Sequence, residues 1–286
     1  MANLDRLRVL VTGAGGMAGR ALTRELAVRH QARALTHQQL DVTDAAAVEK
    51  AVADYRPHLI AHLAAWTDVD GCELDPAKAQ RVNGQGTQNV VDSARRHHAR
   101  VLYVSTDYVF DGTANSPIQE DAPVNPINEY GRSKLAGEKA VQTLTEYFIV
   151  RTSWVFGVGG KNFVDTVARV AFEKDSIEMV EDQLGCPTYA PDLAEALVKI
   201  LETRSYGIYH VTNDTECTWY MLAQEILKRV GSDARLTPIS SEQLSRPARR
   251  PRYSVLANFR LHHLLGFRMR PWREALADHL EQAVAS

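Results

Sequence analysis

The sequence predicts an α/β protein with a Rossmann-type doubly wound parallel sheet and a smaller carboxyl-terminal substrate-binding lobe. Short apolar runs alternate with amphipathic segments of helical period, and this alternation is typical of a parallel sheet covered by helices on both faces. The first apolar run ends in a glycine-rich turn that opens a helix. After Thr152 the alternation is lost and prolines and glycines cluster, which predicts the second lobe.

Length and charge limit the classes of function. The chain has 286 residues, and at roughly 150 residues per domain this length predicts about two domains. Its formal net charge of -2 provides no broad attraction for a polyanion, so we expect no nucleic-acid partner. The single basic cluster, Arg246 to Arg252, is local.

The expected location is the cytoplasm, without a membrane partner. No apolar run approaches the roughly 20 residues that cross a bilayer, and the amino terminus lacks the apolar core of a signal peptide. Cys72, Cys186 and Cys217 are odd in number and widely spaced, so we interpret them as reduced thiols with a structural role. No metal site is predicted, because the paired histidines at 97–98 and 262–263 point apart on a helix.

The order of elements follows from the hydrophobic pattern. We predict strands over 7–12, 32–36, 59–63, 101–106 and 148–151, and helical stretches from the glycine turn to about 29 and near 45–54, 77–97 and 129–145. A strand near 207–211 also reads as buried. We therefore expect an NAD(P)-binding domain over 1–153 that recruits part of 189–212, and a substrate-binding lobe made mainly of 154–286.

The turn after the first strand has glycines at the spacing GxxGxxG. Glycines there permit a tight turn and close approach of the backbone to a pyrophosphate, and the free amides of the following helix would hold the phosphates. The simple alternative is an ordinary turn between strand and helix, but the strand and helix context favours dinucleotide binding. The residues predicted to bind the cofactor here are Gly13, Gly15, Gly16, Met17 and Gly19.

The end of the second strand bears on the choice of cofactor. An acidic residue there would bind the adenosine ribose and favour NAD, but Thr36 and His37 hold this place. Without a carboxylate to repel a 2'-phosphate, both NADPH and NADH are admissible. Asp41 and Val42 follow and would reach the adenine; for Asp41, a cap or turn residue before the helix starting near Asp44 is an equal alternative.

Tyr130 and Lys134 stand four residues apart at the start of a predicted helix and therefore share a face. A neighbouring ammonium stabilises a phenolate, which makes the phenol a better proton donor to a carbonyl that receives hydride. Such pairs also occur by chance on solvated helices, but the dinucleotide turn upstream in the same series of α/β units favours catalysis.

The third polar group lies at the carboxyl end of the predicted strand 101–106, where open α/β sheets bind ligands. The Thr106 hydroxyl would bond the reacting oxygen, and Asp107 would accept from substrate hydroxyls. For Ser105 we favour ordinary turn chemistry.

Together these features resemble the extended branch of the short-chain dehydrogenase/reductase superfamily. Six segments are similar, in order, to successive signatures of the dTDP-4-dehydrorhamnose reductase family. They are Leu40–Asp44, Ala64–Asp70, Ser105–Gly112, Arg151–Gly157, Asp182–Thr188 and Arg250–Ser254. The glycine turn and the tyrosine–lysine pair are shared with many relatives, whereas the Trp154 segment, Asp182–Thr188 and the Arg-Pro-x-x-Ser segment are specific to this smaller group.

The resemblance implies reduction by NADPH or NADH of the 4-keto group of a nucleotide-linked deoxysugar, with dTDP-4-dehydro-L-rhamnose as the leading substrate. It implies Tyr130 as proton donor, Lys134 as its electrostatic partner and a ligand of the nicotinamide ribose, and Thr106 in place of the serine usual in the superfamily. It also implies that Ala64 and Ala65 lie against the cofactor. Trp66 departs from the smaller or differently shaped residue usual in the family at this point.

On the substrate side, the resemblance implies that Asp107 and Trp154 touch the sugar and that Val69 lies near it. Arg250 and its neighbouring arginines would bind the pyrophosphate, or alternatively form a solvated patch. A homodimer is possible, but the sequence does not support it by the family's usual route. In the family an acidic residue often pairs across the dimer through magnesium, and no such residue can be identified here.

Two other functions compete. Some relatives keep the fold and cofactor but act as regulatory subunits of methionine adenosyltransferase; intact Tyr130, Lys134 and Thr106 favour an enzyme. Nucleotide-sugar epimerases and dehydratases share the glycine turn and the pair, but the Trp154 and Arg250 segments match the reductases better.

Overall fold

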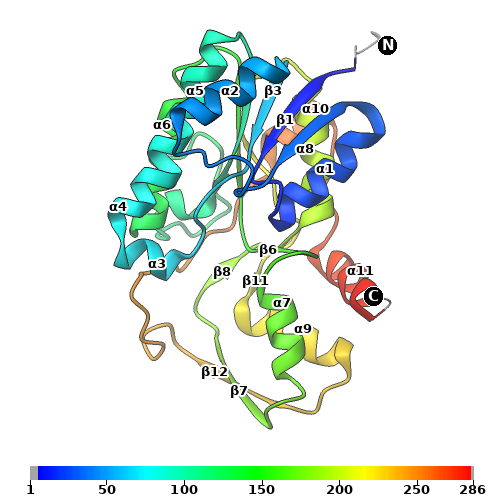
Figure 1. The fold of residues 1–286 in the computed structure, drawn as a ribbon. Coiled ribbons are helices and arrows are strands. Elements are labelled where there is room, and N and C mark those ends of the chain that lie inside the picture. Colours follow the sequence, from blue (N-terminus) through cyan, green and yellow to red (C-terminus); the bar gives the residue numbers. More distant parts are fainter. Residues whose placement is uncertain (1–5, 285–286) are drawn as a thin grey trace.

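The computed structural model describes residues 6–284 and is built around a parallel sheet of six strands (Figure 1). The spatial order is β10-β5-β4-β3-β1-β2, and every pairing is parallel. The strands are β1 (Arg8–Thr12), β2 (Gln31–Leu35), β3 (Leu59–His62), β4 (Arg100–Thr106), β5 (Tyr147–Thr152) and β10 (Gly207–His210). The chain reverses its direction of progress between β1 and β3, so the carboxyl ends of these strands flank the crevice where such sheets bind ligands.

Helices cover both faces of the sheet, because the strands carry apolar side chains on both faces and each face must be shielded from water. On one face lie α1 (Met17–Arg29), α8 (Ala190–Leu201) and α10 (Phe259–Leu265). On the other lie α2 (Ala45–Tyr55), α5 (Gly86–Arg96) and α6 (Glu129–Val141). The predicted Rossmann-type α/β fold is confirmed.

The predicted elements of the sheet are found with small shifts at their ends. The stretch expected as one helix over 77–97 is divided into α4 (Pro76–Ala79), a π-helical turn η1 (Gln80–Gln85) and α5. Hydrophobic periodicity did not predict this division. The side chain that η1 directs inward is the polar Asn83, whose hydrogen bonds reach residues far away in the sequence. The next helix, α6, ends at Val141, before the predicted residue 145.

The remaining elements form a second body below the sheet in Figure 1. Its strands pair in three small sheets, β6 with β9, β8 with β11 and β7 with β12. The bounds are β6 (Val155–Phe156), α7 (Phe163–Val170), β7 (Ser176–Val180), β8 (Leu184–Gly185), β9 (Thr188–Tyr189), β11 (Cys217–Thr218), α9 (Trp219–Val230), β12 (Arg235–Ile239) and α11 (Trp272–Val284). One apolar cluster joins α7, α9 and α11 around the fully buried Trp272.

Late segments also join the sheet layer. Strand β10 pairs with β5, and α8 packs against α1 within the same apolar cluster. The division of the chain into domains at residues 153 and 154 stays a prediction. The cysteines Cys72, Cys186 and Cys217 are free and buried. Within residues 6–284, no helix is long and apolar enough to span a bilayer.

Two short helices complete the site edge of the sheet. Helix α3 (Val69–Leu74) follows the loop after β3, and the 3-10 turn η2 (Asp107–Val109) follows β4 directly. Asp68 caps α3 by accepting from the Gly71 amide at 3.0 Å. Both helices therefore begin at the carboxyl edge of the sheet, where the predicted site residues gather.

Candidate active site

The glycine turn after β1 is packed too tightly for side chains at two positions. Gly13 has a φ of +70°, and a Cβ there would lie 2.5 Å from the backbone nitrogen of Ala64. A Cβ on Gly19 would collide with the carbonyl oxygen of Gly13. Gly13 thus lets the turn lie directly against the loop after β3, and Gly19 lets α1 lie against the turn.

The amino end of α1 is suited to bind phosphate. Its N-cap, Gly16, offers no side chain to the first-turn amides, and the first turn contains no acidic residue. Around Gly15 the nearest atoms to a Cβ position belong to the Thr36 side chain, at 3.6 Å, and the Gly15 carbonyl accepts from Arg20 Nε at 2.9 Å. Amides of this kind and the helix dipole favour an anion, and they fit the pyrophosphate of a dinucleotide.

The end of β2 carries no carboxylate at Thr36 or His37. The backbone and hydroxyl of Thr36 both donate to Gln39 Oε1, at 2.9 and 3.1 Å, which folds the segment into a turn. His37 is exposed. Neither Thr36 nor His37 carries a negative charge that would repel a 2'-phosphate.

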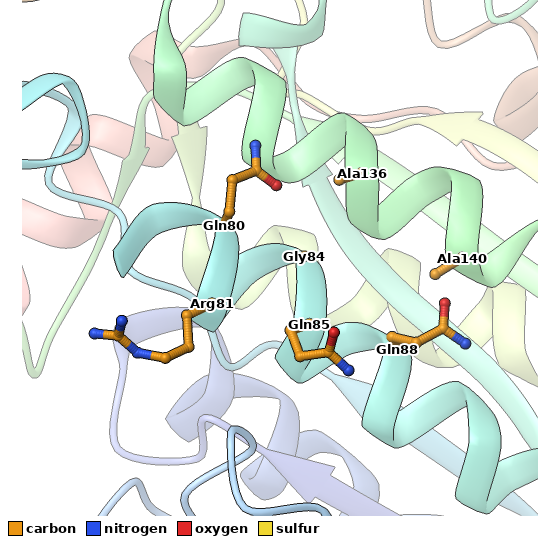
Figure 2. Close-up of a pocket in the computed structure, with 7 residues that line it drawn as sticks. All are labelled: Gln80, Arg81, Gly84, Gln85, Gln88, Ala136 and Ala140. Carbon is orange, nitrogen blue, oxygen red and sulfur yellow. The ribbon is translucent and has the colours of Figure 1, made fainter. Parts of the chain in front are cut away.

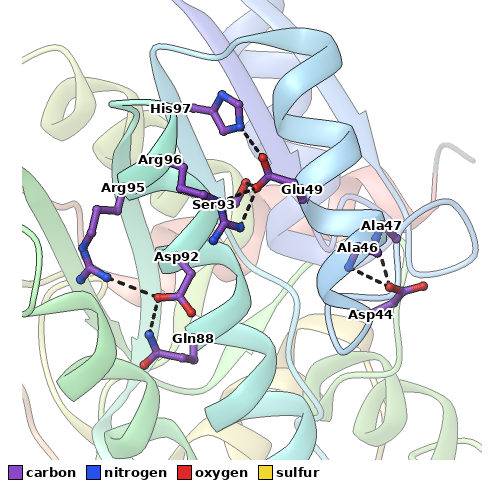
Figure 3. Close-up of polar contacts among 10 residues, drawn as sticks. All are labelled: Asp44, Ala46, Ala47, Glu49, Gln88, Asp92, Ser93, Arg95, Arg96 and His97. Atoms are coloured by element: carbon purple, nitrogen blue, oxygen red, sulfur yellow. Dashed lines mark hydrogen bonds and ion pairs between the residues drawn. The ribbon is translucent and has the colours of Figure 1, made fainter.

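Asp41 is a turn residue. Its Oδ1 accepts from the backbone and the hydroxyl of Thr43, and these bonds hold the pKa of Asp41 below its usual value. The cap of α2 is Asp44, which accepts from the amides of Ala46 and Ala47 (Figure 3). Val42, predicted to lie near adenine, is buried.

The loop that carries Ala64 and Ala65 is tied to β1 by a buried relay. The amide of Ala64 donates to Thr12 Oγ1 at 3.3 Å, and Thr12 Oγ1 lies 2.7 Å from His62 Nδ1. Burial, with the positive charge of Lys134, lowers the pKa of His62 to about 3, so this imidazole is neutral. His62 was not among the site residues predicted from the sequence. It lies in the apolar strand β3, and its hydrogen bond to Thr12 joins residues 50 positions apart.

Asn83 ties the same loop to α6. Its Oδ1 accepts from the Trp66 amide at 2.8 Å, and its Nδ2 donates to the Trp66 carbonyl at 3.0 Å and to Ser133 Oγ at 2.9 Å. The Trp66 indole lies beneath Lys78 Nζ, 4.0 Å from the ring centre. The unusual tryptophan is therefore accommodated beside the loop, and Asn83 is a second residue that sequence reasoning missed.

Tyr130 lies in the first turn of α6, close to the segment that carries Thr106. Asn128 caps α6 by accepting from the Gly131 amide at 2.8 Å, which places Tyr130 in the first turn. Tyr130 is buried and contacts Tyr108 edge to face, with ring centres 5.7 Å apart. Burial raises the pKa of Tyr130 above its usual value, while the nearby Thr106 hydroxyl opposes this shift. The phenol is therefore held protonated, as a proton donor requires.

Lys134 differs in detail from the expectation. Its Nζ donates to the Val104 carbonyl at 2.8 Å and lies 4.1 Å from the centre of the Tyr103 ring. Burial lowers the pKa of Lys134 to about 7, and the negative charge of Glu138 opposes this shift. For Tyr130, burial outweighs any gain from the ammonium, so the expected stabilisation of the phenolate is not what sets its pKa.

Asp107 is buried beside Thr106. Its Oδ1 accepts from Thr106 Oγ1 at 3.0 Å, and Ser254 bonds the same carboxylate. Burial raises the pKa of Asp107 to about 6 despite these bonds. Ser254 belongs to the Arg-Pro-x-x-Ser segment, so the structure joins two predicted signatures at one carboxylate.

This pKa predicts a pH dependence of stability. Because the folded-state pKa of Asp107 lies above the unfolded one, the folded protein binds the proton first as pH falls through about 6. Relative to Asp107→Asn, we expect the unfolding free energy to rise by about 1.4 kcal/mol for each unit of pH lost between about 6 and 4. Urea denaturation at several pH values measures it.

Asp111 provides the matched control, because hydrogen bonds from Thr113 lower its pKa. Asp111→Asn should change the pH dependence in the opposite direction, since that carboxylate stabilises the fold only while ionised. A constant difference between wild type and Asp107→Asn at all pH values would show that the pKa of Asp107 is the same in the folded and unfolded states, which would contradict the prediction.

A cavity of about 920 Å³ lies between the sheet edge and the second body. Tyr108, which contacts Tyr130, lines it together with Val69 and Arg250, both predicted from the sequence. Its far side is formed by α7, α9, β7 and β12. Its size and mixed lining suit a sugar nucleotide.

Trp154 reaches this region through a second tryptophan. The Trp154 indole stacks on Trp219, with ring centres 3.6 Å apart, and Trp219 lines the cavity. Gln183 accepts from the Trp219 indole N–H at 3.1 Å and fixes the ring. Trp154 itself has a φ of +48°. Sequence reasoning missed Trp219, although its amphipathic helix start beside Thr218 was the available signal.

Arg250 is already paired. Its guanidinium donates to both oxygens of Asp70, at 3.0 and 2.8 Å, and Asp70 also accepts from the Ala248 amide. The arginine thereby fastens the 246–250 segment to α3. Arg249 also lines the cavity, is exposed, and has no side-chain partner among residues 6–284. Arg249 is exposed, as expected for a solvated patch, whereas the ion pair of Arg250 with Asp70 has a structural role.

A second hollow of about 480 Å³ lies between η1, the start of α5 and α6, and none of the predicted site residues lines it. Figure 2 shows that its side chains are mostly amides and small residues; they are Gln80, Arg81, Gly84, Gln85, Gln88, Ala136 and Ala140. In the described part of the chain, no group of three or more His, Cys, Asp or Glu side chains is arranged to hold a metal.

The family model described as "RmlD substrate binding domain" matches residues 7–285. The chain belongs to this family. A dTDP-4-dehydrorhamnose reductase from Streptomyces griseus is 44% identical over 287 residues, covering 97% of this chain and 94% of the relative. The likeness to the dTDP-4-dehydrorhamnose reductases predicted from the sequence is confirmed.

Solved structures of this RmlD family agree with the fold. A dTDP-4-dehydrorhamnose reductase from Clostridium acetobutylicum has a TM-score of 0.94 at 37% identity, covering 97% of this chain and 100% of the other. One from Bacillus anthracis, in complex with NADP, has a TM-score of 0.93 at 38% identity, with coverages of 97% and 99%.

Proposed function

We propose that this RmlD-family protein reduces the 4-keto group of a dTDP-linked deoxysugar, with NADPH or NADH as cofactor, and that dTDP-4-dehydro-L-rhamnose is the substrate. The observation that carries the proposal is the burial of Tyr130 against Tyr108, whose backbone amide donates to Thr106 Oγ1 at 3.2 Å at the carboxyl edge of the sheet. This edge lies beside a turn built for a pyrophosphate and a cavity that fits a sugar nucleotide.

Each residue then has a task in the reaction. When bound, the cofactor would supply the hydride that the ketone carbon receives. Tyr130, held protonated by burial, donates its proton to the developing alkoxide, and Thr106 hydrogen-bonds the same oxygen. Lys134 carries the positive charge of the site and is proposed to bind the nicotinamide ribose. The amides at Gly15 and Met17 would hold the pyrophosphate of the cofactor, while the Gly16 amide donates to the Gly13 carbonyl at 3.1 Å and shapes the turn.

The substrate occupies the cavity. Asp107 accepts from sugar hydroxyls, Val69 and the stacked Trp154 and Trp219 limit the space for the ring, and Arg249 is free to meet the diphosphate. Arg250 serves the same region by holding the 246–250 segment in place. Ala64, Ala65, Asp41 and Val42 are proposed to border the cofactor.

The test is NADPH oxidation by the purified protein with a panel of nucleotide-linked 4-ketosugars. We expect saturable oxidation with the dTDP-linked ketosugar and little with UDP- or GDP-linked analogues. A folded protein that binds cofactor but is inactive on the whole panel, and that binds a methionine adenosyltransferase, would favour the regulatory alternative. Conversion of a nucleotide sugar without net oxidation of NADPH would favour an epimerase or dehydratase.

Cofactor choice gives a separate prediction. Because no carboxylate stands at Thr36 or His37, NADPH should bind at least as tightly as NADH. His37→Asp should shift the preference toward NADH by about tenfold or more, since the new charge would repel a 2'-phosphate. Nicotinamide fluorescence titration measures both affinities, with His37→Asn as the neutral control; strong discrimination against NADPH by the wild type would contradict the argument.

The homodimer and the cytoplasmic location stay predictions.

A further inference from the structure

Glu138 lies at the centre of a buried cluster that connects three elements of the site. Its Oε1 accepts from Ser105 Oγ of β4 at 2.6 Å and from Arg151 Nε of β5 at 2.9 Å. Its Oε2 accepts from Arg151 Nη2 at 2.7 Å. The side chains of Glu138 and Arg151 are only 1% and 3% exposed, so this ion pair is removed from solvent.

The cluster touches the catalytic groups through their immediate neighbours. Ser105 directly precedes Thr106, and Glu138 follows Lys134 by one helical turn on α6, the helix that also carries Tyr130. Arg151 is held further by the Glu120 carbonyl at 3.3 Å and by the Phe110 ring. A buried pair of this kind loses solvation energy and adds little stability by itself, which makes a role beyond packing worth testing.

We propose that Glu138 is a positioning residue of the reduction, which balances the positive charge of Lys134 and ties the strand end bearing Thr106 to the helix bearing Tyr130. The proposal rests on the proposed function, and it names a residue outside the catalytic set of Tyr130, Lys134 and Thr106. Ser105, for which turn chemistry was expected, is instead the β4 anchor of this cluster.

Among residues 6–284, Glu138 is the anionic group whose charge raises the pKa of Lys134 and so favours its protonated form. From β4, Tyr103 presents its ring and a phenol whose pKa burial raises well above the usual value. From β3, His62 is neutral, and on α6 Tyr130 is protonated. Arg151 of β5 lies beyond Glu138 and carries a positive charge.

The direction of the effect follows from these charges. Burial lowers the pKa of Lys134 to about 7, and Glu138 opposes this. Removing the carboxylate charge would leave both burial and the unpaired Arg151 to disfavour the ammonium, so the pKa of Lys134 should fall further. The protonated fraction at neutral pH would then decrease, and the activity that depends on it would be lost at a lower pH than in the wild type.

The experiment measures the titration of Lys134 directly. In cofactor-free protein labelled with carbon-13 at lysine Cε, the Lys134 signal is assigned by its absence in Lys134→Arg. We expect Glu138→Gln, which keeps the shape, to lower the Lys134 pKa by about one unit or more. Ser105→Ala, which removes a hydrogen bond but keeps the charge, should change it little. Glu138→Asp should retain most of the wild-type value.

The second readout is the pH dependence of kcat in NADPH oxidation. The alkaline limb for Glu138→Gln should move to lower pH, in the same direction as the Lys134 pKa. Should the single variant fail to fold, the double variant Glu138→Gln, Arg151→Gln leaves no unpaired buried charge and should still move the titration downward. An unchanged Lys134 titration in folded Glu138→Gln or in the double variant would overturn the proposal, whatever happens to turnover. The titration needs no substrate, so an incorrect substrate would leave it intact while abolishing only the kinetic readout.

Discussion

Replacing Tyr130 by phenylalanine is expected to lower turnover by about a hundredfold or more, the usual scale for loss of a positioned proton donor. The ring would stay in its buried place against Tyr108, so the fold should survive. Because the substitution removes only the proton-donating hydroxyl, the loss should appear in kcat, with NADPH affinity nearly unchanged. Steady-state kinetics and fluorescence titration of the same preparation measure the two quantities.

Tyr55→Phe is the control for this prediction. The Tyr55 hydroxyl donates to the carbonyl of Gln31, the first residue of β2, at 3.0 Å. This contact lies at the amino end of the strand, opposite the site edge, so its removal should leave turnover within about twofold of the wild type. Near-normal turnover of Tyr130→Phe with the ketosugar would mean that another group supplies the proton.

Gly13→Ala is expected to weaken NADPH binding by about tenfold or more and to destabilise the fold. The added Cβ would lie 2.5 Å from the Ala64 nitrogen, so the turn and the loop after β3 must move apart. Backbone, not a flexible side chain, blocks the space. The left-handed φ of +70° adds a cost of about 1–2 kcal/mol for a residue with a Cβ. Calorimetric titration with NADPH and urea denaturation provide the measurements.

Gly231→Ala separates the two causes. Gly231 ends α9 with a φ of +72°, and a Cβ there would meet nothing within 4 Å. This variant should show the conformational cost alone, with NADPH affinity unchanged. If Gly13→Ala destabilised no more than Gly231→Ala and bound NADPH normally, the close packing of the turn against Ala64 would have no role in cofactor binding.

The sequence by itself determined the parallel sheet, the glycine turn and the pairing of Tyr130 with Lys134. These features depend on local periodicity and on short spacing, because glycine conformations and helical faces are properties of neighbouring residues. It also determined that Thr106 and Asp107 lie at a strand end, since parallel strands bring their carboxyl ends to one edge. The family likeness came from segments that follow one another along the chain.

Only the tertiary structure decided how these groups are charged and held. The pairing of Arg250 with Asp70, the stack of Trp154 on Trp219 and the bond from Ser105 to Glu138 join residues far apart in sequence. No spacing rule predicts such contacts. Burial likewise depends on the whole packed core, and burial is the largest cause of the shifted pKa values of Tyr130, Lys134 and Asp107. Desolvation is a property of the assembled molecule, so the protonation states at the site could not be derived from the residue types alone.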